Sequence, residues 1–138
     1  MVNKKIYGLI FFLSIEIMMI GVLTFGNSFA YPDNAKKVWN VGYRVDSRDT
    51  NLIDINTTLE QDQTYEKEIE IYNEGNIDAY FDSIKTIGNV DNLDITLENM
   101  DDTIFSDSKK IVVLKVENKG IDALNVDIGV DLLFKELN

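Results

Sequence analysis

The 138-residue sequence contains no cysteine, no histidine and a single proline. Without cysteine no disulfide can stabilise the fold, so stability must come from packing and hydrogen bonds. Without histidine the chain has no Ser-His-Asp or Cys-His catalytic set, and no zinc or copper site with histidine ligands. These absences exclude most hydrolase mechanisms, and we predict a protein that is not an enzyme.

Basic residues are also scarce, with 13 Lys and Arg against 24 Asp and Glu, which gives a formal net charge of −11. Such an acidic chain repels nucleic acid and anionic lipid, so we expect neither DNA nor RNA as a partner. Its apolar and aromatic content is nevertheless too high for a disordered acidic tail. The composition predicts one small folded domain.

The first 30 residues have the order of parts that is typical of a secretory signal. Lys4 and Lys5 precede an apolar run over residues 6–25, and Ser28 and Ala30 are the small residues that a signal peptidase requires. We therefore predict a signal peptide and a domain that works outside the cytoplasm, secreted or at the cell surface.

The fate of this signal has two interpretations. Cleavage before Tyr31 would leave 11 basic and 23 acidic side chains in the mature chain. The apolar run is also long enough to span a bilayer, so an uncleaved anchor with its N-terminus inside is the alternative. In either case we expect membrane contact only through residues 6–25, followed by a flexible linker over residues 31–37.

Downstream of the linker, apolar residues recur at every second position, which is typical of strands that bury one face. The alternating sets are Trp39-Val41-Tyr43-Val45, Ile53-Ile55, Ile69-Ile71, Leu93-Ile95-Leu97 and Leu124-Val126-Ile128-Val130-Leu132. Between Ile111 and Leu114 the apolar residues are consecutive, which predicts a central strand or one buried on both faces. Residues 38–138 are thus predicted to form an all-β antiparallel sandwich, Ig-like or jelly-roll in type, of seven or eight short strands.

One local pattern occurs twice in the sequence. Residues 71–79 (Ile-Tyr-Asn-Glu-Gly-Asn-Ile-Asp-Ala) match residues 116–123 (Val-Glu-Asn-Lys-Gly-Ile-Asp-Ala), with one extra residue in the first copy. Glycine tolerates positive φ, and asparagine can hydrogen-bond the local backbone. We interpret the copies as two hairpin-like turns of one sandwich rather than as a binding motif.

The signal, the strand that opens with Trp39-Asn40-Val41, and this repeated pattern resemble the small exported β-sandwich proteins of Gram-positive bacteria. Camelysin and the TasA biofilm-fibre proteins are examples. The resemblance runs from about Val38 to Val130 and extends to broader bacterial Ig-like surface domains. It implies a cell-surface or extracellular-matrix protein that polymerises into fibres. Camelysin-like proteins are often called metallopeptidases, but this chain lacks His-Glu-x-x-His, so that activity is not carried over.

Acidic side chains cluster in the predicted loops, and their hard oxygen atoms suit calcium. The candidate ligands are Asp46, Asp49, Asp91, Asp94, Asp101 and Asp102. None of them follows the EF-hand spacing, so we favour solvated loop charge and keep calcium as the one cofactor to test. A calcium-dependent or acidic-pair hydrolase that uses Asp101 and Asp102 is the weakest alternative, because adjacent carboxylates point apart.

The sequence therefore predicts a structural or interaction protein of the cell envelope whose partners are other envelope or matrix proteins, or further copies of itself. In an assembly, a strand of one copy could complete the sheet of the next, and residues 31–37 are the candidate donor. The alternative is a monomeric binding module that recognises carbohydrate or another surface protein through its loops.

Overall fold

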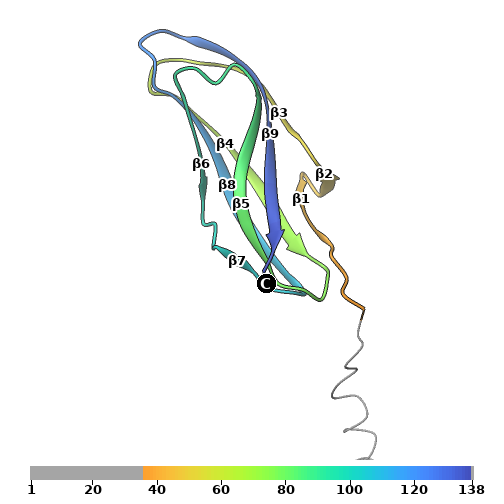
Figure 1. Ribbon diagram of the computed structural model, residues 1–138. Helices are drawn as coiled ribbons and strands as arrows, with labels where there is room; N and C mark the ends of the chain where they lie inside the picture. Colours follow the sequence, from red (N-terminus) through yellow and green to blue (C-terminus); the bar gives the residue numbers. More distant parts are fainter. Residues whose placement is uncertain (1–35, 138) are drawn as a thin grey trace, which may run out of the picture. The chain divides into compact units, whose positions relative to one another are not determined.

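The structure, a computed structural model, describes residues 36–137, whose regular structure consists of β-strands (Figure 1). The strands are β1 (Val41–Val45), β2 (Arg48–Thr50), β3 (Ile53–Leu59), β4 (Thr64–Asn73), β5 (Ala79–Gly88), β6 (Leu93–Glu98), β7 (Thr103–Ile104), β8 (Ser108–Asn118) and β9 (Leu124–Glu136). The predicted signal, with Ser28 and Ala30, lies outside the described residues, as does most of the predicted linker. Within the described part, no helix is long and apolar enough to cross a membrane.

These strands form two antiparallel sheets that pack face to face. Sheet A has the order β2-β1-β4-β8-β6, and sheet B has the order β3-β9-β5-β7. The predicted all-β sandwich is confirmed. The described residues contain nine strands rather than seven or eight, and β2 and β7 have only three and two residues. Lys37–Asn138 forms one compact unit with its own core, so this part can be expected to fold by itself.

The core lies between the sheets and is built from the apolar residues that alternate along each strand. Ile69 and Ile71 of β4, and Val112, Leu114 and Val116 of β8, have no exposed surface. The consecutive apolar run belongs to a central strand, as expected, because β8 lies between β4 and β6. Burial on both faces was wrong, since the outward-facing Ile111 is 51% exposed.

Consecutive strands mostly cross from one sheet to the other, and this connectivity repeats. β1, β3, β4 and β5 alternate between sheets A and B, and β6, β7, β8 and β9 do the same in that order. The two sets correspond strand by strand: β1 to β6, β3 to β7, β4 to β8 and β5 to β9. When each strand is replaced by its counterpart, the orders β1-β4-β8-β6 in sheet A and β3-β9-β5-β7 in sheet B are simply reversed. The sandwich therefore has an internal pseudo-two-fold symmetry that relates its first half, residues 41–88, to its second half, residues 93–136.

Two buried asparagines occupy equivalent positions in the halves. The Asn73 side chain donates to the carbonyl oxygens of Ile77 (2.8 Å) and Ile104 (3.1 Å) and accepts from the Gly75 N–H (3.1 Å). Every bond recurs 45 residues away in the sequence. Asn118 donates to the carbonyls of Asp122 (2.8 Å) and Leu59 (3.0 Å) and accepts from the Gly120 N–H (2.8 Å). Each asparagine has no exposed surface and ties a loop to the end of a strand in the opposite sheet.

This geometry corrects the interpretation of the repeated pattern in two ways. β4 and β5 lie in different sheets, as do β8 and β9, so the two loops are arches between sheets and not hairpins. The hydrogen bonds also align Ile77 with Asp122, without a gap, so the match between the two Ile-Asp-Ala triplets was wrong by one position. The pattern repeats because each arch needs a buried amide side chain to satisfy its backbone groups.

Candidate functional site

The two halves differ most at the edge strands of sheet B. β3 pairs with seven residues of β9, from Leu124 to Val130. Its counterpart β7 pairs only with Ala79 and Tyr80 of β5, and the Phe81 N–H adds one bond to the Asp102 carbonyl oxygen (3.1 Å). No strand of residues 36–137 covers the outer edge of β5 over residues 82–88.

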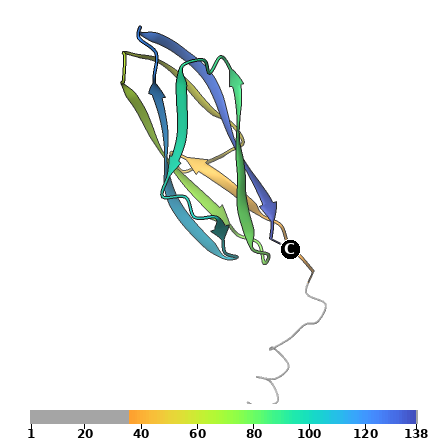
Figure 2. The same ribbon diagram turned by 60° about the vertical axis from the view of Figure 1, so that its left-hand side comes forward.

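Sheet A has the same asymmetry. β1 is covered on its outer edge by β2, through the pairs Tyr43 with Thr50, Arg44 with Asp49 and Val45 with Arg48. The equivalent strand β6 pairs with β8 on one side, and no described strand lies on its other side. These two edges, residues 82–88 of β5 and residues 93–98 of β6, lie on one side of the sandwich, which we name the open side; β2 and β3 end the two sheets on the other side. Figure 2 looks toward this side, with β6 and β5 on its two borders.

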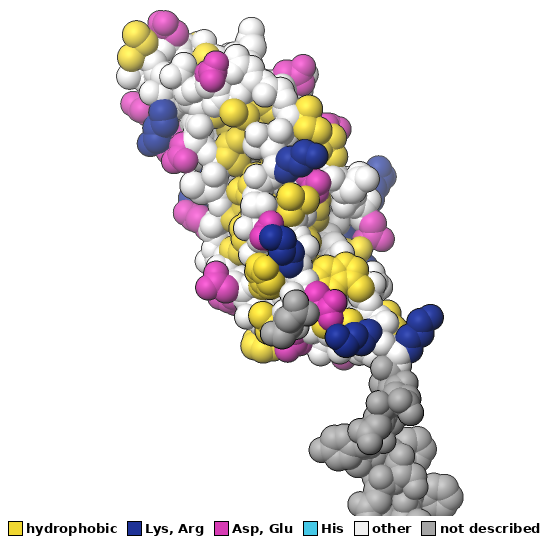
Figure 3. Space-filling view, in the orientation of Figure 1, with side chains coloured by type: hydrophobic (Ala, Val, Ile, Leu, Met, Phe, Trp, Pro, Cys, Tyr) yellow, Lys and Arg dark blue, Asp and Glu magenta, His cyan; other side chains and the backbone are white. Residues whose placement is uncertain are grey.

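Apolar side chains between the sheets remain half-buried on the open side. Ile84 of β5 and Leu93, Ile95 and Leu97 of β6 pack against the core without being fully covered by it. The residue equivalent to Ile95 in the first half is Tyr43, which is only 3% exposed. Hydrophobic side chains are accordingly visible along this face in Figure 3, which has the orientation of Figure 1. A strand added here would cover apolar surface and supply hydrogen-bond partners for unpaired backbone groups.

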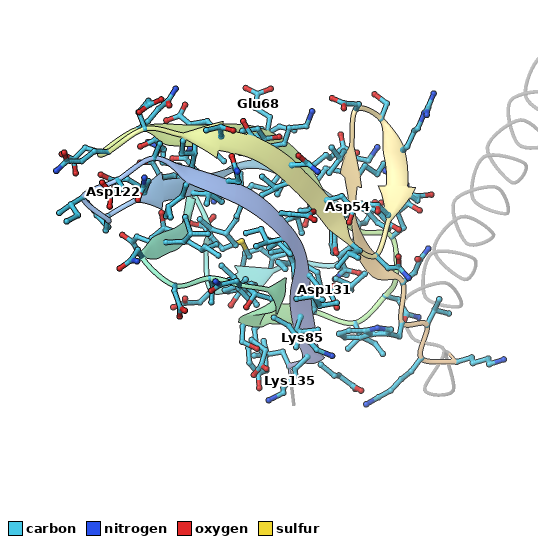
Figure 4. The ribbon with its side chains drawn as sticks, turned by 90° about the horizontal axis from the view of Figure 1, so that it is seen from above. Asp54, Glu68, Lys85, Asp122, Asp131 and Lys135 are labelled. Atoms are coloured by element: carbon cyan, nitrogen blue, oxygen red, sulfur yellow. The ribbon has the colours of Figure 1, made fainter. Side chains whose placement is uncertain are left out.

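Apart from Asp82, which is paired with Lys135 of β9 at 2.6 Å, the charges on the two open edges are opposite in sign. Lys85 of β5 faces away from the core and forms no ion pair among residues 37–137, whereas most basic residues there are paired. Figure 4 shows Lys85 on the outer side of sheet B. On β6 the outward residues are Asp94, Thr96 and Glu98. Glu98 contacts Lys115 of β8 at 2.7 Å, and the hydrogen bonds from Lys115 to Glu98 and Glu66 raise the pKa of that lysine.

The calcium candidates lie in three separate places. Asp46 and Asp49 belong to the β1–β2 hairpin, Asp91 and Asp94 flank the start of β6, and Asp101 and Asp102 precede β7. Among the residues that the structure describes, no group of three acidic side chains is placed to hold a metal ion.

Several of these carboxylates already have cationic partners. Asp46 contacts Lys67 at 2.8 Å, and Asp49 contacts the Arg44 guanidinium at 2.7 Å. Arg44 also contacts Glu70 and Glu74 and lies 4.0 Å from the ring centroid of Tyr72. The hydrogen bonds to Glu74, Glu70 and Asp49 all raise the pKa of Arg44. These acids act as ion-pair partners in the described structure.

A cleft of about 490 Å³ lies beside Asp101 and Asp102. It is lined by Met100, Asp101, Asp102, Phe105 and Lys110, among others. Asp101 is paired with Lys110, and Asp101 and Asp102 are the two acidic residues among those that line the cleft. The geometry therefore gives no support to the acidic-pair hydrolase.

The chain that enters the domain is hydrogen-bonded to the first arch. The N–H groups of Glu74 and Asn76 donate to the carbonyls of Asn40 (2.8 Å) and Val38 (3.1 Å). The Val38 N–H donates to the Asn76 side chain (2.7 Å). Residues 38–40 thus lie against the arch as an extra extended segment, whereas strand β1 itself begins only at Val41.

The candidate site is the open side, to which no pattern in the sequence points directly. β6 was recognised from its alternation, but β5 was not, because a bulge between Phe81 and Ser83 interrupts its register. Lys85 and Ile84 were therefore missed as site residues. No family model matches the chain, and no match is found among the curated proteins or the solved structures.

Proposed function

We propose that this protein is a non-enzymatic structural or interaction protein of the cell surface, and that it associates with other chains by pairing of β-strands. The open side is the observation that carries the proposal. Two neighbouring unpaired edges beside half-buried apolar residues offer a template for pairing with another chain. Such a surface suits a protein whose function is to associate with other chains.

The sequence features support a location outside the cytoplasm and a role without catalysis. The signal over residues 1–30 favours a secreted or cell-surface protein, and the acidic composition favours solubility after export. The resemblance to exported sandwich proteins of Gram-positive bacteria supports a matrix, biofilm-fibre or appendage subunit. Because consecutive strands cross between the sheets, we assign the sandwich to the jelly-roll rather than to the Ig-like type.

Sedimentation velocity on residues 31–138, over a range of protein concentrations, tests the proposal. We expect the fraction of species larger than the monomer to rise with protein concentration. The same measurement on a chain that lacks residues 31–37 will show whether that segment is a donor strand. Millimolar calcium added to one series tests the acidic loops as ligands. A monomer under every condition would contradict self-association.

A monomeric binding module is the second candidate, and one residue favours it. Ile121, in the arch between β8 and β9, is 82% exposed, more than any other large hydrophobic residue that the structure describes. An isolated apolar side chain on a loop can anchor a protein ligand. A monomer that binds a surface protein or a carbohydrate, and loses that affinity in Ile121→Ser, would support this alternative.

A further inference from the structure

The two uncovered edges match one another in length and position. β5 beyond its bulge contributes residues 83–88, and β6 contributes residues 93–98, so that each edge has six residues. The short loop 89–92 joins them, which places Gly88 and Leu93 at the same end of the sandwich. The two strands therefore run in opposite directions from that end, one in each sheet.

We infer that the open side binds the open side of a second copy of this chain. A two-fold axis parallel to the strands would place β6 of the second copy beside β5 in an antiparallel orientation, and β5 of the second copy beside β6. Such an interface is isologous, because each copy offers the same surface to the other. Both open edges would become paired, and the two sandwiches would share two continuous sheets. The inference rests on the proposed function and names the partner and the site.

The side chains on the two faces of each strand define the register between β5 and β6 of the second copy. Side chains that point inward must lie opposite side chains that point inward, since a slip of one residue turns a strand over. Matching the ends of the six-residue edges places Ile84 opposite Leu97 of the second copy and Thr86 opposite its Ile95. The half-buried apolar residues of both copies would then lie in one continuous core.

The same register explains the charges. Lys85 would lie opposite Thr96 of the second copy, with Asp94 and Glu98 of that copy at the two diagonal positions. A diagonal neighbour lies about 7 to 8 Å away, which is within reach of a lysine side chain. The lysine that lacks an ion pair in the single chain would thus gain two acidic neighbours. This local attraction opposes the repulsion between two chains that each carry a large negative charge.

Cysteine cross-linking tests this arrangement directly, because the chain has no native cysteine. Two single variants of residues 31–138, Lys85→Cys and Thr96→Cys, are mixed under mild oxidation. Positions directly opposite in an antiparallel pair have the Cα separation that a disulfide requires. We expect a disulfide-linked dimer from the mixture and far less from either variant alone, because the axis keeps identical positions apart. A mixture of Arg48→Cys and Thr96→Cys is the matched control, since Arg48 is an exposed cation of β2, on the opposite edge of sheet A.

Charge reversal gives a second readout that does not depend on a disulfide. Lys85→Glu should weaken association at least tenfold, Asp94→Lys in the same chain should restore it, and Arg48→Glu should leave it unchanged. All three side chains are exposed, so the fold should tolerate these changes.

The outcomes separate this inference from the proposed function. If the unmodified chain associates but cross-linking and charge reversal have no effect, the two-fold pairing is overturned and association by another surface stands. Cross-linking of either variant alone as fast as the mixture would also overturn it. If the unmodified chain stays a monomer at every concentration, self-association and the dimer fail together.

Discussion

The first and second halves of the sandwich share one plan and differ at their borders. Both have a central strand that ends in a buried asparagine, an arch held by that asparagine, and a strand that returns in the other sheet. In the first half, the hairpin strand β2 covers β1, and β3 pairs along seven residues with β9. In the second half β6 has no neighbour on its outer edge, and β7 pairs with only two residues. The comparison separates what the fold needs, which is present twice, from the borders, which differ between the halves and carry the proposed association.

The shared part of the plan is tested by removing the buried amides. Asn73→Ala and Asn118→Ala each leave two carbonyl oxygens and one N–H without their partner inside the protein. We expect each variant to lose about 3 kcal/mol of unfolding free energy, since buried unsatisfied groups cost about 1 to 3 kcal/mol apiece. Urea unfolding measures the loss, and similar values for both variants would confirm that the halves are equivalent.

The control for this prediction is another asparagine on the surface. Asn125 accepts a hydrogen bond from the Thr58 hydroxyl at 2.9 Å but is exposed, so Asn125→Ala should cost no more than about 0.5 kcal/mol. Losses of that small size in the two buried positions would contradict the role assigned to the arches.

The two arches differ in how closely a neighbouring segment lies against them. The Asn40 carbonyl oxygen accepts from Glu74, and the Asn92 carbonyl oxygen accepts in the same way from Lys119, but the two bonds between Val38 and Asn76 have no counterpart in the described part of the second arch. A Cβ atom at Gly75 would lie 2.2 Å from the Val38 carbonyl oxygen, whereas at Gly120 the nearest atom, in the Asn118 side chain, would be 3.1 Å away. Gly75→Ala should therefore displace residues 38–40 and cost about 1 to 2 kcal/mol through the lost hydrogen bonds. Gly120→Ala should cost less. Trp39 is the only tryptophan, so its fluorescence should change in the first variant and not in the second.

A further difference between the halves is a hydrogen bond from Tyr43 to the opposite sheet, which the equivalent residue of the second half does not form. The hydroxyl of the buried residue Tyr43 donates to the Asp131 carboxylate at 2.9 Å, and the ring centroids of Tyr43 and Phe134 are 6.4 Å apart. The equivalent position, Ile95, offers no such bond. Tyr43→Phe keeps the ring and should cost about 1 kcal/mol of unfolding free energy in urea. A cost near zero would show that the hydrogen bond to Asp131 contributes no net stability.

Much of this plan could be predicted from the sequence, because alternation reports burial along one strand. The strands around Ile55, Ile71, Ile95 and Val130 were found in this way, and the sandwich was inferred from their number. Strand order was not accessible, because it depends on which strands meet across long connections. The open side was missed for this reason, as was the nature of the two arches, since an Asn-x-Gly turn looks alike in a hairpin and in a crossing between sheets.

The dependence of stability on pH gives the finest test of the Tyr43 contact. Burial, and secondly the hydrogen bond to Asp131, raise the pKa of Tyr43 above its ordinary value. Below pH 10 the phenol is protonated in both the folded and the unfolded chain, so its contribution to stability is fully present. Above pH 10 the unfolded chain releases the proton and the folded chain keeps it, which lowers the unfolding free energy as the pH rises.

Comparing the wild-type chain with Tyr43→Phe by urea unfolding at pH 8, 10 and 11 cancels the other titrating groups. We expect the wild-type advantage to be constant up to about pH 10 and to shrink beyond it. An advantage that stays constant to pH 11 would mean that Tyr43 ionises as easily in the folded as in the unfolded protein, so that neither its burial nor its hydrogen bond to Asp131 raises its pKa in solution.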